Sequence, residues 1–146
     1  MLTNNHQQKP MIPQSKNTIK KVCTSYQEIL AAYVFGSRAK GGATAGSDLD
    51  LALLLEKDTE QEFDFLGFKV ELEGVLDIEV DIGILNCAGE PIKHQVRRDG
   101  KVVFDRDPEK RKRFEIMSRK YYQDFLHLHK IYMQGLKRSL RNKYGG

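Results

Sequence analysis

Apolar residues recur at two different spacings along the chain, and the change from one spacing to the other predicts helices and strands. Steps of three and four residues predict an amphipathic helix over about residues 17–32. Residues 33–35 have high β-propensity and are followed by Gly36, which predicts a short strand that leads into a loop. Residues 48–55 predict a strand buried on both faces, because their interior is almost wholly apolar.

The middle of the chain shows both spacings, first that of a helix and then that of a strand. Residues 59–76 predict a helix with Asp58 as its N-cap. Strict alternation over 77–85 predicts a strand with one acidic and one buried face. The buried face would carry Ile78, Val80, Ile82 and Ile84.

The last third of the chain predicts a short helix, a strand and a long helix. The short helix is expected near residues 90–98 and the strand at 101–104. Asp107 as N-cap and Pro108 at the first helical position open the long helix, which runs to about residue 141. Its apolar and aromatic stripe is expected to pack into the core.

These elements predict an α+β fold, a mixed β-sheet flanked by helices with a long C-terminal helix. The 146 residues suit one domain, expected over residues 16–143, after a disordered polar leader at 1–15. No apolar run reaches membrane-spanning length, and the start of the chain does not read as a secretory signal. A cytoplasmic protein with no membrane contact is therefore expected, with Cys23 and Cys87 as buried free thiols.

Charge is segregated along the chain. Residues 44–90 hold thirteen acidic side chains and two lysines, whereas residues 105–146 hold twelve basic side chains and five acidic ones. The basic segment is compatible with a solvated helix face, a surface for a protein partner or a nucleic-acid patch, of which the last is not expected in so small a chain. The acidic segment is suited to divalent cations.

Three aspartates form the candidate catalytic and metal-binding site. Asp48 and Asp50 would share one face of a strand because they are two residues apart, and Asp81 lies on the acidic face of the later strand. Adjacent carboxylates repel each other, and Mg²⁺, which takes one or two carboxylates together with phosphate oxygens, relieves the repulsion. If the two strands are neighbours, the three acids could hold two Mg²⁺ ions.

The loop that begins at Gly36 supplies candidate nucleotide-binding residues. Gly36 allows backbone N–H groups to approach a phosphate, and the Ser37 hydroxyl adds a donor. Arg38 and Lys40 can neutralise phosphate charge. A Gly-Ser pair or an Asp-x-Asp alone is a weak signal, but their joint spacing, followed by Asp81, favours catalysis over an acidic surface.

The stretches 36–41 (Gly-Ser-Arg-Ala-Lys-Gly) and 47–51 (Ser-Asp-Leu-Asp-Leu) resemble the signature of the DNA polymerase β-type nucleotidyltransferase superfamily. In its small size the chain resembles the minimal nucleotidyltransferase branch of this superfamily. Many members of that branch are antitoxins paired with a HEPN-domain toxin. Similarity also extends over parts of the later chain, and in all it covers roughly residues 17–141. Those parts are residues 80–86, 96–100, 113–115 and 121–125.

The resemblance implies Mg²⁺ as cofactor, ATP as substrate and transfer of AMP to a tyrosine hydroxyl of the cognate HEPN ribonuclease toxin. It also implies that Gly36 and Ser37 bind the phosphates and that Asp48, Asp50 and Asp81 hold the metals. The partner is expected to contact the C-terminal helix and the active-site face. Two alternatives stay open: an antitoxin that neutralises the toxin by binding alone, and a transferase acting on a small-molecule acceptor.

Overall fold

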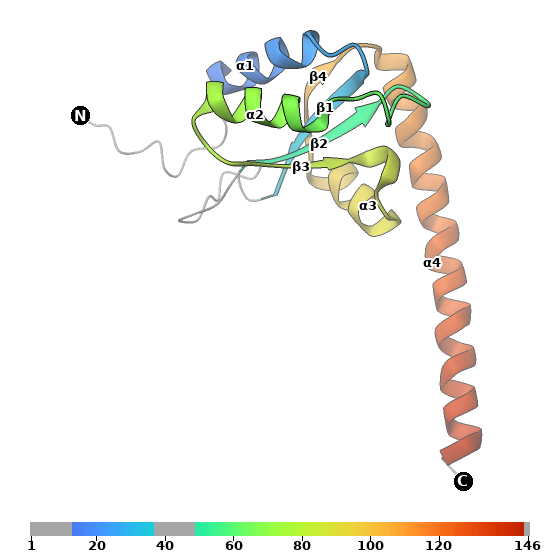
Figure 1. Ribbon diagram of the computed structural model, residues 1–146. Coiled ribbons are helices and arrows are strands. Elements are labelled where there is room, and N and C mark those ends of the chain that lie inside the picture. The colour runs from blue at the N-terminus through green and yellow to red at the C-terminus, as the bar shows by residue number, and fades with distance from the viewer. Residues whose placement is uncertain (1–12, 37–48, 145–146) are drawn as a thin grey trace.

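The computed structural model describes residues 13–36 and 49–144, which form one mixed sheet with helices on both faces (Figure 1). The strand order is β3-β2-β1-β4, with β1 antiparallel to both neighbours and β2 parallel to β3. The predicted α+β class is confirmed. In chain order the elements are α1 (Pro13–Thr24), β1 (Ile29–Phe35), β2 (Leu49–Leu55), α2 (Phe65–Leu76), β3 (Val80–Ile84), the 3₁₀ turn η2 (Leu85–Cys87), α3 (Glu90–Asp99), β4 (Lys101–Asp105) and α4 (Pro108–Tyr144).

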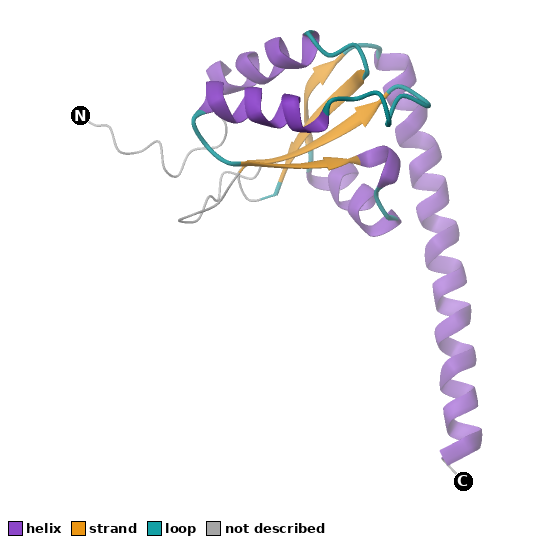
Figure 2. Ribbon diagram, in the orientation of Figure 1, coloured by secondary structure: helices purple, strands orange, loops and turns teal. Residues whose placement is uncertain are grey.

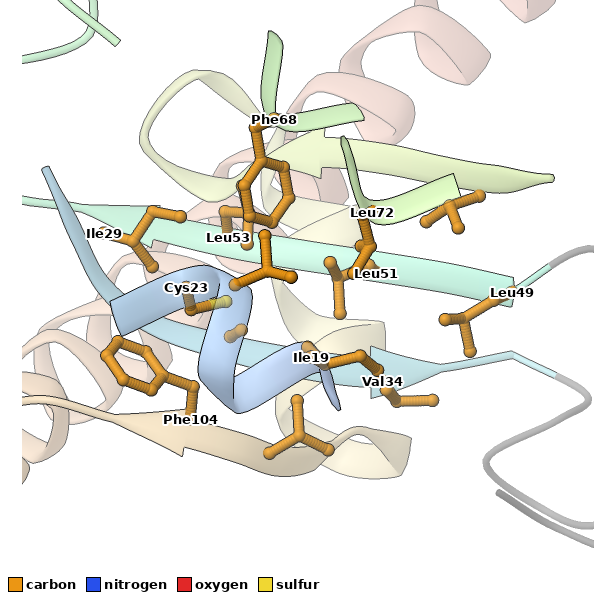
Figure 3. Packing of buried hydrophobic residues seen from close by; sticks show 14 of the residues in the cluster. Ile19, Cys23, Ile29, Val34, Leu49, Leu51, Leu53, Phe68, Leu72 and Phe104 are labelled. Atoms are coloured by element: carbon orange, nitrogen blue, oxygen red, sulfur yellow. The ribbon is translucent and has the colours of Figure 1, made fainter. Parts of the chain in front are cut away.

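Helices cover both faces of the sheet (Figure 2), and each face buries its own apolar core. We call the cluster under α1 and α2 the first core; Phe68 and Leu72 of α2 meet the strands there (Figure 3). The second core lies on the opposite face, where α3 contributes Val96 and α4 contributes Phe114. Because both faces are covered, β1 and β2 are apolar at nearly every position. The second core comprises Leu30, Ala31, Tyr33, Ala52, Leu54, Leu85 and Val96.

The first predicted helix is wrong in its extent. Helix α1 spans Pro13–Thr24 instead of 17–32, and Ile29 already begins β1. Residues 29–34 are all buried, so both faces of this segment are apolar. A continuous apolar run fits a buried strand and a buried helix equally well by periodicity. The turn between Ser25 and Glu28 is what separates the two elements.

The second helix starts later than predicted. Asp64, not Asp58, is the N-cap of α2, and its Oδ1 accepts a hydrogen bond from the Gly67 N–H at 2.9 Å. Helix α2 ends at Asp77, which has a left-handed backbone (φ 58°), so the following strand begins only at Val80. The predicted apolar face is confirmed, since Val80 belongs to the first core and its three isoleucine neighbours pack against it.

Helix α4 begins as predicted. Asp107 Oδ1 accepts a hydrogen bond from the Lys110 N–H at 3.3 Å, and Pro108 is the first helical residue. Its first turns are tied to the sheet by Arg111, which pairs with Asp105 and Glu115, both at 2.7 Å. These contacts hold the start of α4 against the second core.

The rest of α4 does not pack as predicted. The 37-residue helix is about 55 Å long and extends well past the sheet (Figure 1). Beyond Ser118 the apolar and aromatic stripe of α4 is exposed, so the expectation that it packs into the core is wrong there. The reason is that this part of the helix extends past the edge of the sheet (Figure 1) and has no sheet surface to cover. The exposed large side chains from there on are Tyr121, Phe125, Leu126, Leu128, Ile131, Tyr132, Leu136, Leu140 and Tyr144.

Two further expectations can be compared with the described residues. Cys23 is buried, and burial raises the pKa of its thiol to about 12, but Cys87 is exposed, contrary to prediction, because it lies in the η2 turn at the surface. Within residues 13–36 and 49–144, no helix has the length and apolar content needed to cross a bilayer.

Arg106 joins three elements through backbone carbonyls. Its Nε donates to Ile29 O at 2.8 Å, and its Nη2 donates to Cys23 O at 3.2 Å and Tyr26 O at 3.1 Å.

We expect Arg106→Ala to lower the free energy of unfolding by about 1–3 kcal/mol, because carbonyls at the end of α1 lose their donors. Urea denaturation followed by circular dichroism measures this. Arg138→Ala, on exposed α4, should change stability by less than about 0.5 kcal/mol; equal effects would contradict the role given to Arg106.

Candidate active site

The register of β2 and β3 brings two of the predicted aspartates together. Asp50 and Asp81 are direct partners across this parallel pair. Their neighbours Leu49 and Val80, also partners, belong to the first core, so the two aspartates point to the opposite face, the face covered by α3. Neighbouring strands lie about 4.8 Å apart, a spacing at which two carboxylates can share one ion.

The two aspartates differ in their surroundings. Asp50 is half-buried; along its strand the next residue on the same face is Ala52 of the second core, and its partner on β1 is Phe35. Asp81 is exposed and lies on β3, an edge strand of the described sheet. The pair therefore stands at the rim of the second core, with one carboxylate near apolar neighbours and one open to solvent.

Gly36 follows the last residue of β1 and lies against Asp50, one member of this pair. Its backbone has φ +83°, and a Cβ built there would overlap the Oδ2 atom of Asp50. Two independent requirements, a left-handed backbone and the close approach of a carboxylate, therefore select glycine. The structure thus places the first residue of the predicted phosphate-binding loop against a predicted metal ligand.

We expect Gly36→Ala to lower the free energy of unfolding by about 1–2 kcal/mol, since an L-residue is strained at this φ. The added methyl group would also push the Asp50 carboxylate from its position. Gly83→Ala is the matched control, because Gly83 lies on β3 of the same sheet and a Cβ there meets nothing within 4 Å. Thermal denaturation of both variants would refute the requirement if they melted alike.

The other predicted site residues, Ser37, Arg38, Lys40 and Asp48, lie outside the described residues. Within the described part of the chain, no group of three or more His, Cys, Asp or Glu side chains has the arrangement of a metal site. The contribution of Asp48 as a third carboxylate therefore stays a prediction.

The described carboxylates fit a hard divalent cation. Like charges directly opposite each other on neighbouring strands are destabilising, and Asp50 and Asp81 are such a pair. Oxygen ligands from one or two carboxylates, with the remaining positions left for water and phosphate, are the donor set that Mg²⁺ takes in phosphoryl-transfer sites. Asp50 and Asp81 therefore suit Mg²⁺ by residue type, by register and by the face of the sheet that they share.

A polar network on the same face was not found by sequence reasoning. The Tyr33 hydroxyl donates to Glu115 Oε2 at 2.8 Å, and Arg111 Nη1 donates to the same oxygen at 2.7 Å. Burial first, and then the hydrogen bond to Glu115, raise the pKa of Tyr33 well above its usual range, so the phenol remains a neutral donor. The i,i+4 spacing of Arg111 and Glu115 was visible in the sequence, but nothing there linked them to Tyr33.

A carboxylate pair at the strand ends of a mixed sheet, beside a glycine bend, has the oxygen ligands that hold divalent cations in enzymes of phosphoryl transfer. Residues 17–109 match the protein family described as "Polymerase beta, Nucleotidyltransferase". The match spans more than half of the chain, and the chain belongs to this nucleotidyltransferase family.

Individual relatives agree with this assignment. The chain is 29% identical over 105 residues to protein adenylyltransferase MntA of Aphanizomenon flos-aquae (strain 2012/KM1/D3), covering 66% of this chain and 70% of that protein. Its fold is similar to a toxin–antitoxin crystal structure with AMP-PNP (TM-score 0.70, 22% identity, 84% of this chain and 98% of that one). It is also similar to a chain in the structure of a tri-AMPylated Shewanella oneidensis HEPN toxin in complex with MNT antitoxin (TM-score 0.63, 20% identity, 87% of this chain and 99% of that one).

Proposed function

We propose that this protein is an Mg²⁺-dependent protein adenylyltransferase that transfers AMP from ATP to a tyrosine hydroxyl of a cognate HEPN ribonuclease toxin, and so acts as an antitoxin. The observation that carries the proposal is the pairing of Asp50 with Asp81 on one face of the sheet, beside Gly36. The name of the Aphanizomenon relative, a protein adenylyltransferase, supports the same reaction class. Cytoplasmic action is part of the proposal.

Each predicted site residue receives a role in this reaction. Asp50 and Asp81, with Asp48, would hold Mg²⁺, expected as two ions, which when bound would stabilise charge on the phosphates and assist loss of the phenolic proton. Gly36 and Ser37 would donate hydrogen bonds to the triphosphate. Arg38 and Lys40 would neutralise charge on the outer phosphates.

The proposed chemistry is a single displacement at phosphorus. The acceptor oxygen forms a bond to the α-phosphorus of ATP, and the bond from that phosphorus to the bridging oxygen breaks, so pyrophosphate leaves. A tyrosine hydroxyl has an ordinary pKa near 10, so its proton must be lost during the reaction. Water or a carboxylate of the site would receive this proton, and Asp81, which is exposed, is the carboxylate open to an approaching acceptor.

The toxin would contact this chain through α4 and the active-site face. The outer half of α4 carries a stripe of exposed apolar residues at steps of three and four, the pattern of a helix that lies in a partner's groove. Basic side chains lie on the remainder of the same helix. A toxin surface that combines apolar and acidic residues would therefore fit it. Neither membrane nor nucleic acid is part of the proposal.

The direct test incubates the purified chain with Mg²⁺, ATP radiolabelled at the α-phosphate and a HEPN protein encoded by a neighbouring gene. Label on the HEPN protein, lost when its acceptor tyrosine is changed to Phe, is the expected result. Absence of label under conditions where the two proteins associate would overturn the proposal.

One other function has a specific observation in its favour. The exposed stripe on α4 could neutralise a toxin by contact alone, without chemistry. Replacing both Asp48 and Asp50 with Asn separates the two readings: full neutralisation by that variant favours binding, whereas loss of neutralisation with the complex intact favours transfer. A small-molecule acceptor would instead be indicated by pyrophosphate release that depends on the small molecule and needs no protein partner.

A further inference from the structure

An ion pair on α2 closes around the backbone of β3 immediately before Asp81. Lys69 Nζ donates to Glu73 Oε2 at 3.0 Å and to the carbonyl oxygen of Val80 at 2.6 Å. The Val80 N–H donates to the same Glu73 oxygen at 2.9 Å. Both backbone polar groups of Val80 are thus satisfied by this one pair, which we call the Lys69–Glu73 clasp.

The clasp acts on the free edge of the sheet. In the described sheet, β3 is an end strand with β2 as its neighbour. The Leu49 N–H donates to Glu79 O at 3.2 Å, so Glu79 faces β2 and the backbone of the next residue, Val80, faces away from it. An edge strand with unpaired backbone groups can slip or pair with another chain, and the clasp removes that freedom at one residue.

Register at this position decides where Asp81 points. A slip of β3 by one residue would move every side chain to the opposite face, which would turn Asp81 toward the first core and away from Asp50. The side chain of Val80, fully buried in the first core, opposes this slip from one face of the sheet. The clasp opposes it from the edge, because both hydrogen bonds to Val80 would have to break.

We infer that Lys69 and Glu73 are positioning residues that hold Asp81 opposite Asp50, so that the two carboxylates can share a divalent cation. This inference rests on the proposed function for the identity of the shared cation. The residues act through the β3 backbone and do not need to touch substrate. Loss of the clasp leaves the sheet assembled and loosens the metal site.

The ionisation of the clasp agrees with this role. The hydrogen bond from Val80 first, and then that from Lys69, lower the pKa of Glu73 below its usual value. A lowered carboxylate pKa means that the contact is intact at neutral pH and is lost only as pH falls below the ordinary Glu range, near 4.3.

The test compares Glu73→Gln and Lys69→Gln with the wild type in Mn²⁺ titrations followed by electron paramagnetic resonance. We expect Mn²⁺ binding about 10- to 100-fold weaker in both variants, the size of effect seen when groups that orient metal ligands are removed. Hydrogen exchange of the Asp81 amide, measured by NMR, should accelerate as well. The AMP-transfer assay should show a lower kcat with little change in the KM for the toxin.

Lys110→Met is the matched control, since Lys110 pairs with Glu56 at 3.2 Å beyond the far end of β2 from Asp50. It should leave Mn²⁺ affinity and Asp81 exchange unchanged. Lys69→Arg, which keeps the charge, should restore much of both. Should Glu73→Gln fail to fold, Lys69→Gln keeps the Glu73 carboxylate on the Val80 N–H and carries the same comparison.

The outcomes separate this inference from the proposed function. Folded clasp variants with wild-type Mn²⁺ affinity and wild-type Asp81 exchange would overturn the inference, whatever the transfer assay shows. A wild-type protein that binds Mn²⁺ at Asp50 but labels no toxin would defeat the proposed function and leave the inference standing. If the wild type binds no Mn²⁺, the shared-cation claim is wrong.

Discussion

Asp50→Asn is expected to reduce AMP transfer by about 10³-fold or more, which corresponds to about 4 kcal/mol of lost transition-state stabilisation. The reason is its place in the structure: Asp50 is paired with Asp81, is half-buried at the rim of the second core and lies against Gly36. A neutral amide there cannot balance the charge of a cation that stabilises phosphate oxygens.

Single-turnover assays with saturating ATP and Mg²⁺ measure this effect, with circular dichroism confirming that the variant is folded. Asp58→Asn is the control, because Asp58 occupies a turn with φ 64° that Asn also tolerates and lies beyond the end of β2 that is opposite to Asp50. A rate within tenfold of wild type for Asp50→Asn would mean that this carboxylate does not hold a catalytic metal.

The second large effect concerns the surface of α4. Leu128→Glu combined with Tyr132→Glu is expected to weaken toxin binding by about 10²-fold or more, since apolar and aromatic residues central to an interface each contribute about 2 kcal/mol or more. Both side chains are 64% exposed, so their replacement should leave the melting temperature nearly unchanged. The expected signature is therefore lost association without lost stability.

Isothermal titration calorimetry of the chain with a toxin variant that lacks ribonuclease activity measures this association. The matched control is His127→Glu combined with Gln134→Glu, which adds the same charge to the opposite side of the same helix. If both double variants bind equally well, α4 is not the docking surface and the toxin must rely on the active-site face.

Together these two changes separate recognition from chemistry. The Asp50 variant should bind the toxin and fail to label it, whereas the α4 variant should retain the metal site and fail to associate. Mn²⁺ binding in the absence of toxin should be unaffected by the α4 change.

The sequence by itself determined the features that depend on interactions between residues close together in the chain. Alternation at residues 78–84 predicted the face of β3 correctly, because one face is buried and side chains on a strand alternate. Asp107 and Pro108 predicted the start of α4, because capping is a local interaction. The spacing of Gly36, Asp50 and Asp81 was also sufficient to nominate a site.

The tertiary structure alone decided what depends on neighbours distant in sequence. That β2 and β3 are adjacent, parallel and in a register that pairs Asp50 with Asp81 follows from packing of α2 across them, which no local pattern encodes. Residues 29–32 became strand because both their faces are buried in the fold, although their spacing also fits a helix. The stripe on α4 had the periodicity of a core helix, and only the extent of the sheet left it exposed.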